Sequence, residues 1–100
     1  MTYSYSDEAR FASAVERYLF DAGGEATIGQ IRRAIPFYMK LTSQDRRPSR
    51  TRPGEEMWEQ LVRNIVCHRK SQGNAVNAGT LEYKPRRLAL PRSPQGNLFH

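Results

Sequence analysis

Cysteine is almost absent from this chain of 100 residues, in which Cys67 is the single copy. One thiol cannot form a disulfide within the chain, and no Cys and His residues are spaced as zinc ligands are. No apolar run approaches the roughly 18 residues that a membrane-spanning helix needs. The N-terminal MTYSYSDEARF lacks the basic and then apolar regions of a signal peptide. We therefore expect one cytoplasmic domain with no membrane partner, no metal and no other cofactor.

Acidic residues are scarce after residue 30. Residues 1–30 hold two Arg against five acids, a net charge of −3, whereas residues 31–100 hold fourteen Lys or Arg against five acids, a net charge of +9. A basic region confined to part of a chain is typical of proteins that bind a polyanion. The asymmetry favours nucleic acid as the partner over a generally basic surface.

The strongest periodic stretch is Pro53–Lys70, PGEEMWEQLVRNIVCHRK, which predicts one amphipathic helix. Apolar residues recur at the i, i+3, i+4, i+7 spacing of a buried stripe, and polar residues occupy the opposite face. Pro53 suits the first turn, Glu55 and Glu56 suit the positive end of the helix dipole, and His68 suits the negative end. A helix buried on one face and polar on the other can serve as a DNA recognition helix.

Two further helices and a hairpin are predicted around it. The first helix is capped by Ser6 and ends at Gly23-Gly24. A capping box, Thr27-x-x-Gln30, opens the second, and Pro36 ends it because the residue before proline disfavours the helical region. Alternating residues from Thr80 to Leu90, with the basic turn Lys84–Arg87, predict a β-hairpin. Residues 1–90 thus form the domain, and residues 91–100 a tail or linker.

This order of elements predicts an α+β, mainly helical fold, a winged helix-turn-helix with three helices and a C-terminal β-hairpin wing. In such a fold the third helix enters the major groove, and the wing Lys84–Arg87 lies along the backbone. The segment Arg46–Arg52, RRPSRTR, precedes the predicted recognition helix, so basic clusters flank the helix on both sides.

Three pieces also carry a family resemblance: GGEATIGQIRRAI, LTSQDRRPSRTRPGEEMWEQLVRNIVCHR and GNAVNAGTLEYKPRRLAL. They resemble the winged-helix modules fused to restriction-type nucleases with HNH or PD-(D/E)xK catalytic domains, some of which sense N6-methyladenine in DNA. The most specific part runs from Trp58 through Val62-Arg63-Asn64 to His68, followed by Gly73-Asn74. The resemblance implies a double-stranded DNA partner and a fused nuclease domain. Recognition of methylated DNA is a property of only some members of the family. No nuclease motif accompanies the module, so we expect no enzyme activity in this chain.

Candidate DNA contacts follow from residue chemistry. For base reading we single out Gln60, Arg63 and Asn64, because Arg can bridge the two acceptors of guanine and Asn can pair with the edge of adenine. The alternative for Arg63 is a helical ion pair with Glu59, one turn earlier. The predicted backbone contacts are Arg46, Arg47, Ser49, Arg50, Arg52, His68, Lys70, Asn74, Lys84, Arg86 and Arg87. Trp58 could wall a methyl pocket, but its place on the apolar stripe favours the core.

Competing interpretations remain open from sequence alone. A winged helix can instead be a protein-interaction module whose basic face meets an acidic partner, since a fold does not fix a function. Cys67 is expected to be half-buried and inert, because the sequence places no base beside it. Glu56 and Glu59 are expected to cap the helix rather than to contact cytosine.

Overall fold

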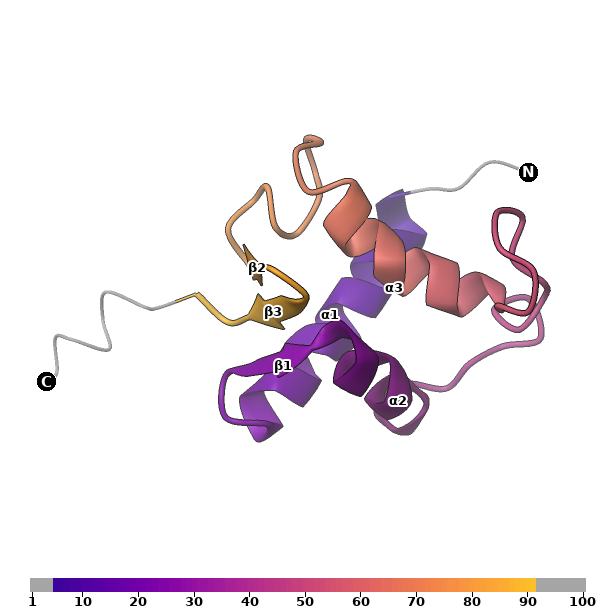
Figure 1. Cartoon of the computed structure of the whole chain (residues 1–100), viewed down its shortest axis with the longest axis horizontal. Helices are drawn as coiled ribbons and strands as arrows, with labels where there is room; N and C mark the ends of the chain where they lie inside the picture. Colours follow the sequence, from indigo (N-terminus) through magenta and orange to yellow (C-terminus); the bar gives the residue numbers. More distant parts are fainter. Residues whose placement is uncertain (1–4, 92–100) are drawn as a thin grey trace, which may run out of the picture.

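The computed structural model describes residues 5–91, and Figure 1 shows how their elements are arranged. They follow one another as α1 (Tyr5–Asp21), β1 (Glu25–Thr27), α2 (Ile28–Tyr38), α3 (Met57–Cys67), β2 (Glu82–Lys84) and β3 (Arg87–Ala89). Three helices and a three-stranded antiparallel sheet make an α+β fold, as predicted. None of the helices in this part of the chain has the length and apolar character to cross a membrane. Apart from Pro91, the predicted tail lies outside the described residues.

The sheet joins the two ends of the domain. Its order is β1-β3-β2, so the predicted hairpin of β2 and β3 is confirmed and β1 pairs with the far side of β3. Ala26 lies opposite Leu88 in this pairing, and both are buried in the core. The short extended link predicted after the first helix is therefore an edge strand.

Helix α1 lies at the centre of the molecule and contributes several fully buried residues to the core. Phe11, Val15 and Leu19 recur every four residues and are fully buried, as the apolar stripe predicts. The helix ends where predicted, because Gly24 adopts a φ of 107° and its N–H bonds to the Leu19 carbonyl oxygen at 2.8 Å. Only glycine adopts such a backbone conformation without strain. The helix begins at Tyr5, so Ser6 lies inside it and is not the predicted cap.

The start of α2 is as predicted and its end is not. The capping box is present: Thr27 Oγ1 accepts from the Gln30 N–H at 3.1 Å, and Gln30 Oε1 accepts from the Thr27 N–H at 2.9 Å. Pro36 does not end the helix, which continues to Tyr38. A proline near the end removes one hydrogen bond, and here the last turn is held from outside, since Arg17 donates to the Tyr38 carbonyl oxygen at 2.8 Å.

Helix α3 is shorter than predicted at both ends, spanning Met57–Cys67 rather than residues 53–70. Glu56 is its N-cap, and the Glu59 carboxylate accepts from the Glu56 N–H at 2.9 Å, so the predicted capping roles of these two residues are confirmed. Pro53 and Gly54 form a turn before the helix, with Gly54 at a φ of 83°. His68 is the C-cap, and the chain leaves the helix there.

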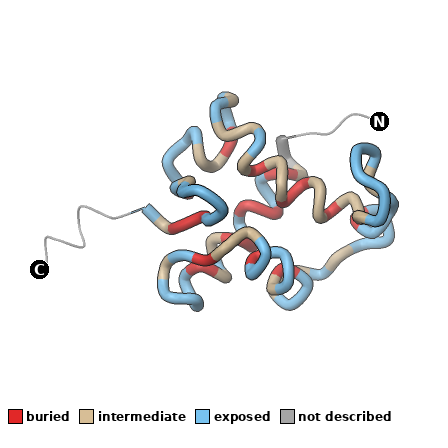
Figure 2. Tube along the Cα trace, viewed as in Figure 1, coloured by how far each residue is buried: buried red, intermediate tan, exposed pale blue. Residues whose placement is uncertain are grey.

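The core lies between the inner faces of the helices and the hairpin, and Figure 2 shows its buried positions spread over all the described elements. Trp58, Leu61, Val62 and Ile65 are the buried residues of α3, so its apolar stripe is confirmed. Trp58 is only 7% exposed, and its indole N–H donates to Glu56 Oε1 at 2.8 Å. Trp58 is therefore a core residue, which was the favoured interpretation. Truncating it should cost about 3–5 kcal/mol.

Candidate nucleic-acid interface

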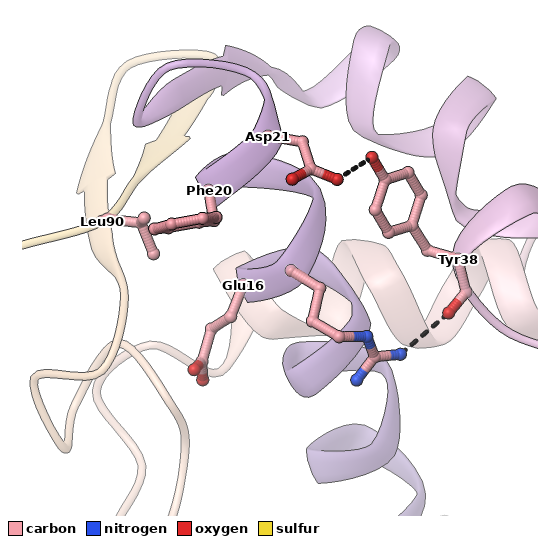
Figure 3. A pocket seen from close by; sticks show the side chains of 6 residues that line it. Glu16, Phe20, Asp21, Tyr38 and Leu90 are labelled. Carbon is pink, nitrogen blue, oxygen red and sulfur yellow. Dashed lines mark hydrogen bonds between the residues drawn. The ribbon is translucent and has the colours of Figure 1, made fainter.

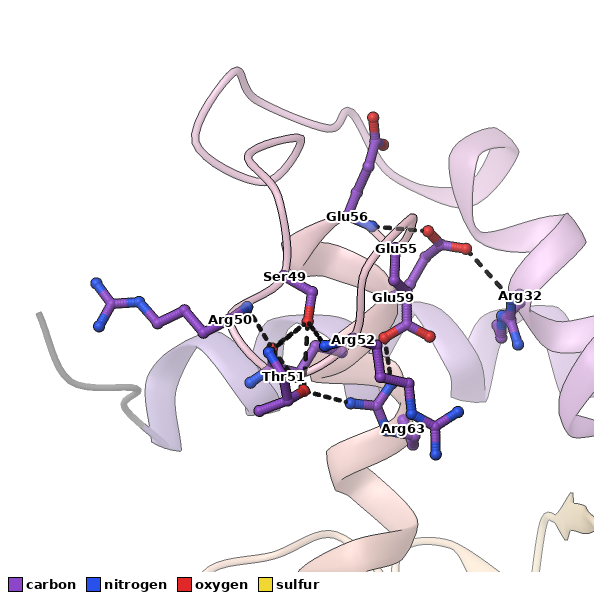
Figure 4. A network of polar contacts seen from close by, with 10 residues as sticks. Arg32, Ser49, Arg50, Thr51, Arg52, Glu55, Glu56, Glu59 and Arg63 are labelled. Atoms are coloured by element: carbon purple, nitrogen blue, oxygen red, sulfur yellow. Dashed lines mark hydrogen bonds and ion pairs between the residues drawn. The ribbon is translucent and has the colours of Figure 1, made fainter.

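A folded loop of residues 49–56, which we call the arginine loop, precedes α3 (Figure 4). Its organiser is Ser49, whose hydroxyl oxygen accepts from the N–H groups of Thr51 at 3.1 Å and Arg52 at 3.2 Å. The two ends of the loop meet, because the Ser49 N–H donates to the Glu55 carbonyl oxygen at 2.8 Å. Pro48, just before the loop, and Glu56, its last residue, also pair in an isolated antiparallel bridge. The middle of the loop is thus presented at a defined position beside the start of α3.

Gln60, one of the predicted base-reading residues, holds this loop. Its Oε1 atom accepts from the Ser49 hydroxyl at 2.6 Å, from the Arg50 N–H at 3.3 Å and from the Thr51 hydroxyl at 3.3 Å. The carbonyl side of the amide is therefore already used inside the protein.

Arg63, the second predicted base-reading residue, is bound to the same loop. It forms an ion pair with Glu55 and donates to the Thr51 hydroxyl at 2.9 Å. The ion-pair partner is Glu55 rather than Glu59, the alternative that helical spacing suggested. The side chains of Arg63 and Glu55 are only 20% and 10% exposed, so this pair is largely shielded from solvent.

Asn64, the third, differs from the other two. It lies one residue further along α3, is half-buried, and its side-chain amide makes no hydrogen bond within residues 5–91. Of the three predicted base readers it is the one whose polar group is not used by the fold.

The base of the arginine loop is tied to α1 through Asp45. This buried carboxylate accepts from Arg10 Nη2 at 2.8 Å and from the Thr42 N–H at 2.8 Å. Burial alone would raise the pKa of Asp45, but the hydrogen bonds from Arg10 and Thr42 outweigh it and lower that pKa. Thr42 and Asp45 bond reciprocally, since the Asp45 N–H also donates to the Thr42 hydroxyl oxygen at 3.1 Å.

Several arginines near the start of α3 are paired with glutamates, and of these only Arg46 and Arg63 were predicted to contact DNA. Arg46 lies 3.3 Å from Glu56, and Arg32 of α2 lies 3.3 Å from Glu59 of α3. Arg47 instead donates to a backbone carbonyl, that of Gln44. Cations with no ion pair or side-chain hydrogen bond among the described residues are Arg33, Lys40, Arg50, Arg52, Lys70 and Arg86.

The hairpin also carries both paired and unpaired cations. Lys84 and Arg87 both bind the Glu25 carboxylate of β1, at 2.9 Å and 3.1 Å. The hydrogen bond from Lys84 is the main reason that the pKa of Glu25 is lowered. Arg86, between them in sequence, is exposed at the tip, and its side chain has no partner among residues 5–91.

Arg86 also has an uncommon backbone. Its φ is 63°, the only positive value among the non-glycine residues described. Pro85 and Arg86 form the two-residue turn of the hairpin, and Pro85 is fixed at negative φ, so the residue after it supplies the positive φ. Arginine in this conformation is strained, and such strain gathers at functional sites.

Contacts between elements connect these unpaired cations. The carbonyl oxygen of Arg86 accepts from the N–H of Ile28 at 3.0 Å, which places the hairpin tip beside the start of α2. Arg33 lies on the exposed side of α2. The Arg32–Glu59 pair then bridges α2 to α3, beside the arginine loop. These contacts link the elements that carry Arg86, Arg33 and the arginine loop, and we call the exposed, unpaired arginines on these elements the basic surface.

A groove of about 340 Å³ lies on this path, between α2 and α3. Arg32, Arg33 and Glu59 line it with the edge of Trp58. Because Trp58 is buried, it offers the groove only a small part of its indole ring, and the methyl-pocket role stays a prediction.

Asn74 is a clear correction, because it is fully buried and cannot contact a DNA backbone. Its amide nitrogen donates to Glu8 at 2.9 Å and to the Ile65 carbonyl oxygen at 3.0 Å. Its oxygen accepts from the N–H groups of Val76 and Asn77. Asn74 is therefore the internal anchor of the segment after α3.

The other residues near the end of α3 agree with their predictions to different degrees. His68 Nδ1 lies 3.1 Å from the buried Glu8 carboxylate, so this imidazole faces the protein. Lys70 is exposed, as a phosphate contact requires. Cys67 is exposed rather than half-buried, because it ends α3 on the side away from the core. Within residues 5–91, no three His, Cys, Asp or Glu side chains gather as metal ligands do.

A different surface lies on the outer side of α1 (Figure 3). Here a groove of about 520 Å³ is lined by Phe20, Tyr38 and Leu90, with Asp21 at its edge. The Tyr38 hydroxyl donates to Asp21 at 2.5 Å, and this bond raises the pKa of Tyr38. Phe20 is 78% exposed and Phe37 is 87% exposed. The one cation that lines this groove, Arg17, is hydrogen-bonded to Ser13 and to the Tyr38 carbonyl oxygen.

Sequence reasoning missed Arg33, and it missed the covering of α3 by the arginine loop. Arg32 and Arg33 are visible in the sequence as two arginines on the outer face of the second helix. What could not be seen is that the hairpin tip docks at the start of that helix. The glutamates that neutralise Arg46, Arg63 and Lys84 come from other elements, so sequence distance hides them.

The chain matches no protein-family model, and comparisons with curated proteins and with solved structures also gave no match.

Proposed function

We propose that this protein is a winged-helix module that binds double-stranded DNA. In this proposal β2 and β3 are the wing and α2 and α3 form the helix-turn-helix. The observation that carries it is the connected basic surface, on which Arg33, Arg50, Arg52 and Arg86 stand exposed with no acidic partner in the described part of the chain. Exposed guanidinium groups of this kind suit phosphate oxygens, and counterion release makes such contacts favourable.

The strained turn at Arg86 adds support. Glycine or asparagine would adopt a positive φ at lower cost, yet a long cation stands at the tip. A residue kept against its conformational preference is a reason to infer a functional role. The wing tip contacting a phosphate would be such a role.

The family resemblance suggests the wider role. We propose that the module targets a restriction-type nuclease to DNA, with any catalytic activity in a separate nuclease domain. Sensitivity to adenine methylation is a further part of the proposal, supported by the resemblance and by the position of Trp58 at the α2–α3 groove.

A second candidate is a protein-interaction winged helix, which meets an acidic protein through the same surface. One observation favours it: Arg32, Arg46, Arg63, Lys84 and Arg87 are already neutralised by glutamates, which weakens the attraction for a polyanion. Such a module should bind DNA only weakly at physiological salt.

A titration of labelled duplexes from about 50 to 200 mM salt separates these candidates. Three duplexes should be compared: one with N6-methyladenine, the same sequence unmethylated, and a scrambled control. DNA binding predicts that affinity falls by about 0.9 log units per log unit of salt for each phosphate contact. Methyl sensing predicts preference for the methylated duplex. Absence of binding to all three at about 150 mM salt would contradict DNA binding and favour the protein-interaction candidate.

Variants locate the surface in the same assay. Arg33→Ala and Arg86→Ala should each lower affinity and reduce the salt slope by about 1, as loss of one phosphate contact does. Lys40→Ala, at an exposed cation that the proposal does not use, is the matched control and should change neither value. If both arginine variants bound like the wild type, the proposed docking surface would be wrong.

A further inference from the structure

The outer face of α3 is covered where a recognition helix should be open. Gln60 and Arg63 lie in the first two turns of α3, and both are bound to the arginine loop through Ser49, Thr51 and Glu55. For either residue to reach a base edge, several of these hydrogen bonds would have to break. The first half of α3 therefore supports another element rather than reading DNA itself.

That element is the arginine loop, and its backbone is held from two sides. Ser49 fixes the N–H groups of Thr51 and Arg52, and Gln60 accepts from the N–H of Arg50. A side chain on such a backbone loses less freedom on binding than one on an open loop, so its placement is more exact.

Two guanidinium groups project from this fixed backbone. Figure 4 shows Arg50 extending away from the network of polar contacts. Arg50 and Arg52 are exposed, and neither side chain has a partner within residues 5–91. The carboxylates around the base of the loop are neutralised, since Glu55 binds Arg63, Glu56 binds Arg46 and Glu59 binds Arg32. The net charge of the loop surface is therefore concentrated on its two projecting arginines.

We propose that the arginine loop, and not the outer face of α3, enters a groove of the duplex and that Arg50 and Arg52 read guanine there. This rests on the proposed DNA binding. Guanine presents two adjacent acceptors, N7 and O6, in the major groove, which match the planar fork of a guanidinium group. In this proposal Arg33 and Arg86 contact phosphates at the edge of the interface. Base reading and phosphate contact are thus assigned to different arginines.

Variants that conserve the charge test whether Arg50 and Arg52 read guanine or only contact phosphates. Arg50→Lys and Arg52→Lys keep the positive charge but lose the planar fork that binds guanine bidentately. A selection from randomised duplexes with the wild type first defines the preferred site. Competition binding then compares that site with versions in which each guanine is replaced.

The expected result is a guanine-containing preferred site, with each lysine variant losing part of the preference at one guanine position, up to the roughly 5- to 150-fold that a bidentate pair supplies. Affinity for unrelated duplex DNA and its salt slope should stay at the wild-type values. Lys40→Arg, at an exposed cation that the proposal does not use, is the matched control and should leave the guanine preference intact. Asn64→Ala should also leave the preference intact.

Three outcomes would overturn the inference while DNA binding stands. The wild type could bind duplexes without base preference, the lysine variants could keep the full preference, or Asn64→Ala could abolish it. If the wild type bound no duplex at all, the proposed function itself would fail. Circular dichroism of each variant checks that the fold is intact, and the exposed positions of Arg50 and Arg52 favour that result.

Discussion

The two irregular segments that flank α3 are anchored in opposite ways. The arginine loop before the helix is held by Ser49, Gln60 and Arg63, which lie at or near the surface. Residues 68–81 after the helix are held by Asn74, which is fully buried and bonds to the buried Glu8. The first segment keeps Arg50 and Arg52 exposed, whereas the second buries Asn74, which had been predicted to contact DNA. The difference teaches that a polar residue in a loop indicates a binding site only when the fold does not consume its hydrogen bonds.

The largest expected effect on stability is that of Asn74→Ala, which removes the anchor of the second segment. It removes the hydrogen bonds to Glu8, to Ile65 and to two backbone N–H groups, and leaves a buried carboxylate with one partner fewer. We expect the free energy of unfolding to fall by about 2–4 kcal/mol in urea titrations. Asn77→Ala, at an exposed position of the same segment, is the control and should change it by less than about 0.5 kcal/mol. Equal effects of the two variants would mean that Asn74 is not the anchor.

The next largest effect concerns Asp45, which precedes the arginine loop. Its pKa is lowered in the folded state, so the stability it contributes is present above the unfolded pKa of about 3.9 and is lost as pH falls through the folded pKa. Asp45→Asn should lower the free energy of unfolding by about 1–3 kcal/mol at pH 7.

Thermal unfolding from pH 7 to pH 2.5 measures this dependence. The difference between wild type and Asp45→Asn should shrink as pH drops below about 4, because the wild-type carboxyl becomes protonated and also loses its charge. A constant difference across this range would contradict the ion pair with Arg10. Asp7→Asn, at a largely exposed carboxylate 3.9 Å from Arg10, should cost less than about 1 kcal/mol.

A smaller effect sharpens the comparison between the segments. Ser49→Ala removes the hydroxyl that holds the Thr51 and Arg52 N–H groups, so amide exchange at these two positions should accelerate, with a stability loss of about 0.5–1.5 kcal/mol. Ser71→Ala changes a serine of the second segment whose hydroxyl makes no hydrogen bond with the described residues. It should alter neither exchange nor stability. Unchanged exchange in Ser49→Ala would show that Gln60 and Arg63 hold the loop without it.

The smallest expected stability effect is at the hairpin tip. Arg86→Gly relieves a positive φ that arginine adopts at a cost, while glycine loses more freedom on folding. The two effects nearly cancel, so thermal unfolding should show a change between zero and a gain of about 1 kcal/mol. DNA affinity should fall in the same variant. Arg86→Ala keeps the strain and should show no gain, and a clear loss of stability in Arg86→Gly would contradict the strain argument.

Periodicity and capping chemistry predicted most of the fold. The apolar stripes of α1 and α3, the Thr27–Gln30 capping box and the hairpin all follow from local spacing, and the structure confirms them. The errors concern ends that depend on distant contacts. Pro36 stays within α2 because Arg17 holds the following turn, and the predicted start of α3 at Pro53 is lost to the folding of the arginine loop.

The candidate site was less predictable than the fold. The sequence shows many arginines but not which of them are paired, because Glu25, Glu55 and Glu56 reach their partners only in the folded chain. Asn74 looked like a surface donor because its burial depends on Glu8, which lies 66 positions away. Exposure and pairing are tertiary properties, and they decide which basic residues stay available to DNA.

The central claim is that the arginine loop faces DNA and the segment after α3 does not. Its most direct test is a nuclear magnetic resonance titration of the labelled protein with a duplex at about 150 mM salt, following the backbone amides. The account predicts that the largest shifts fall on residues 49–56, on Arg86 and around Arg33, with residues 71–81, around the buried Asn74, nearly unchanged. Shifts concentrated on residues 71–81 or on the Phe20 groove, with the arginine loop unchanged, would contradict it.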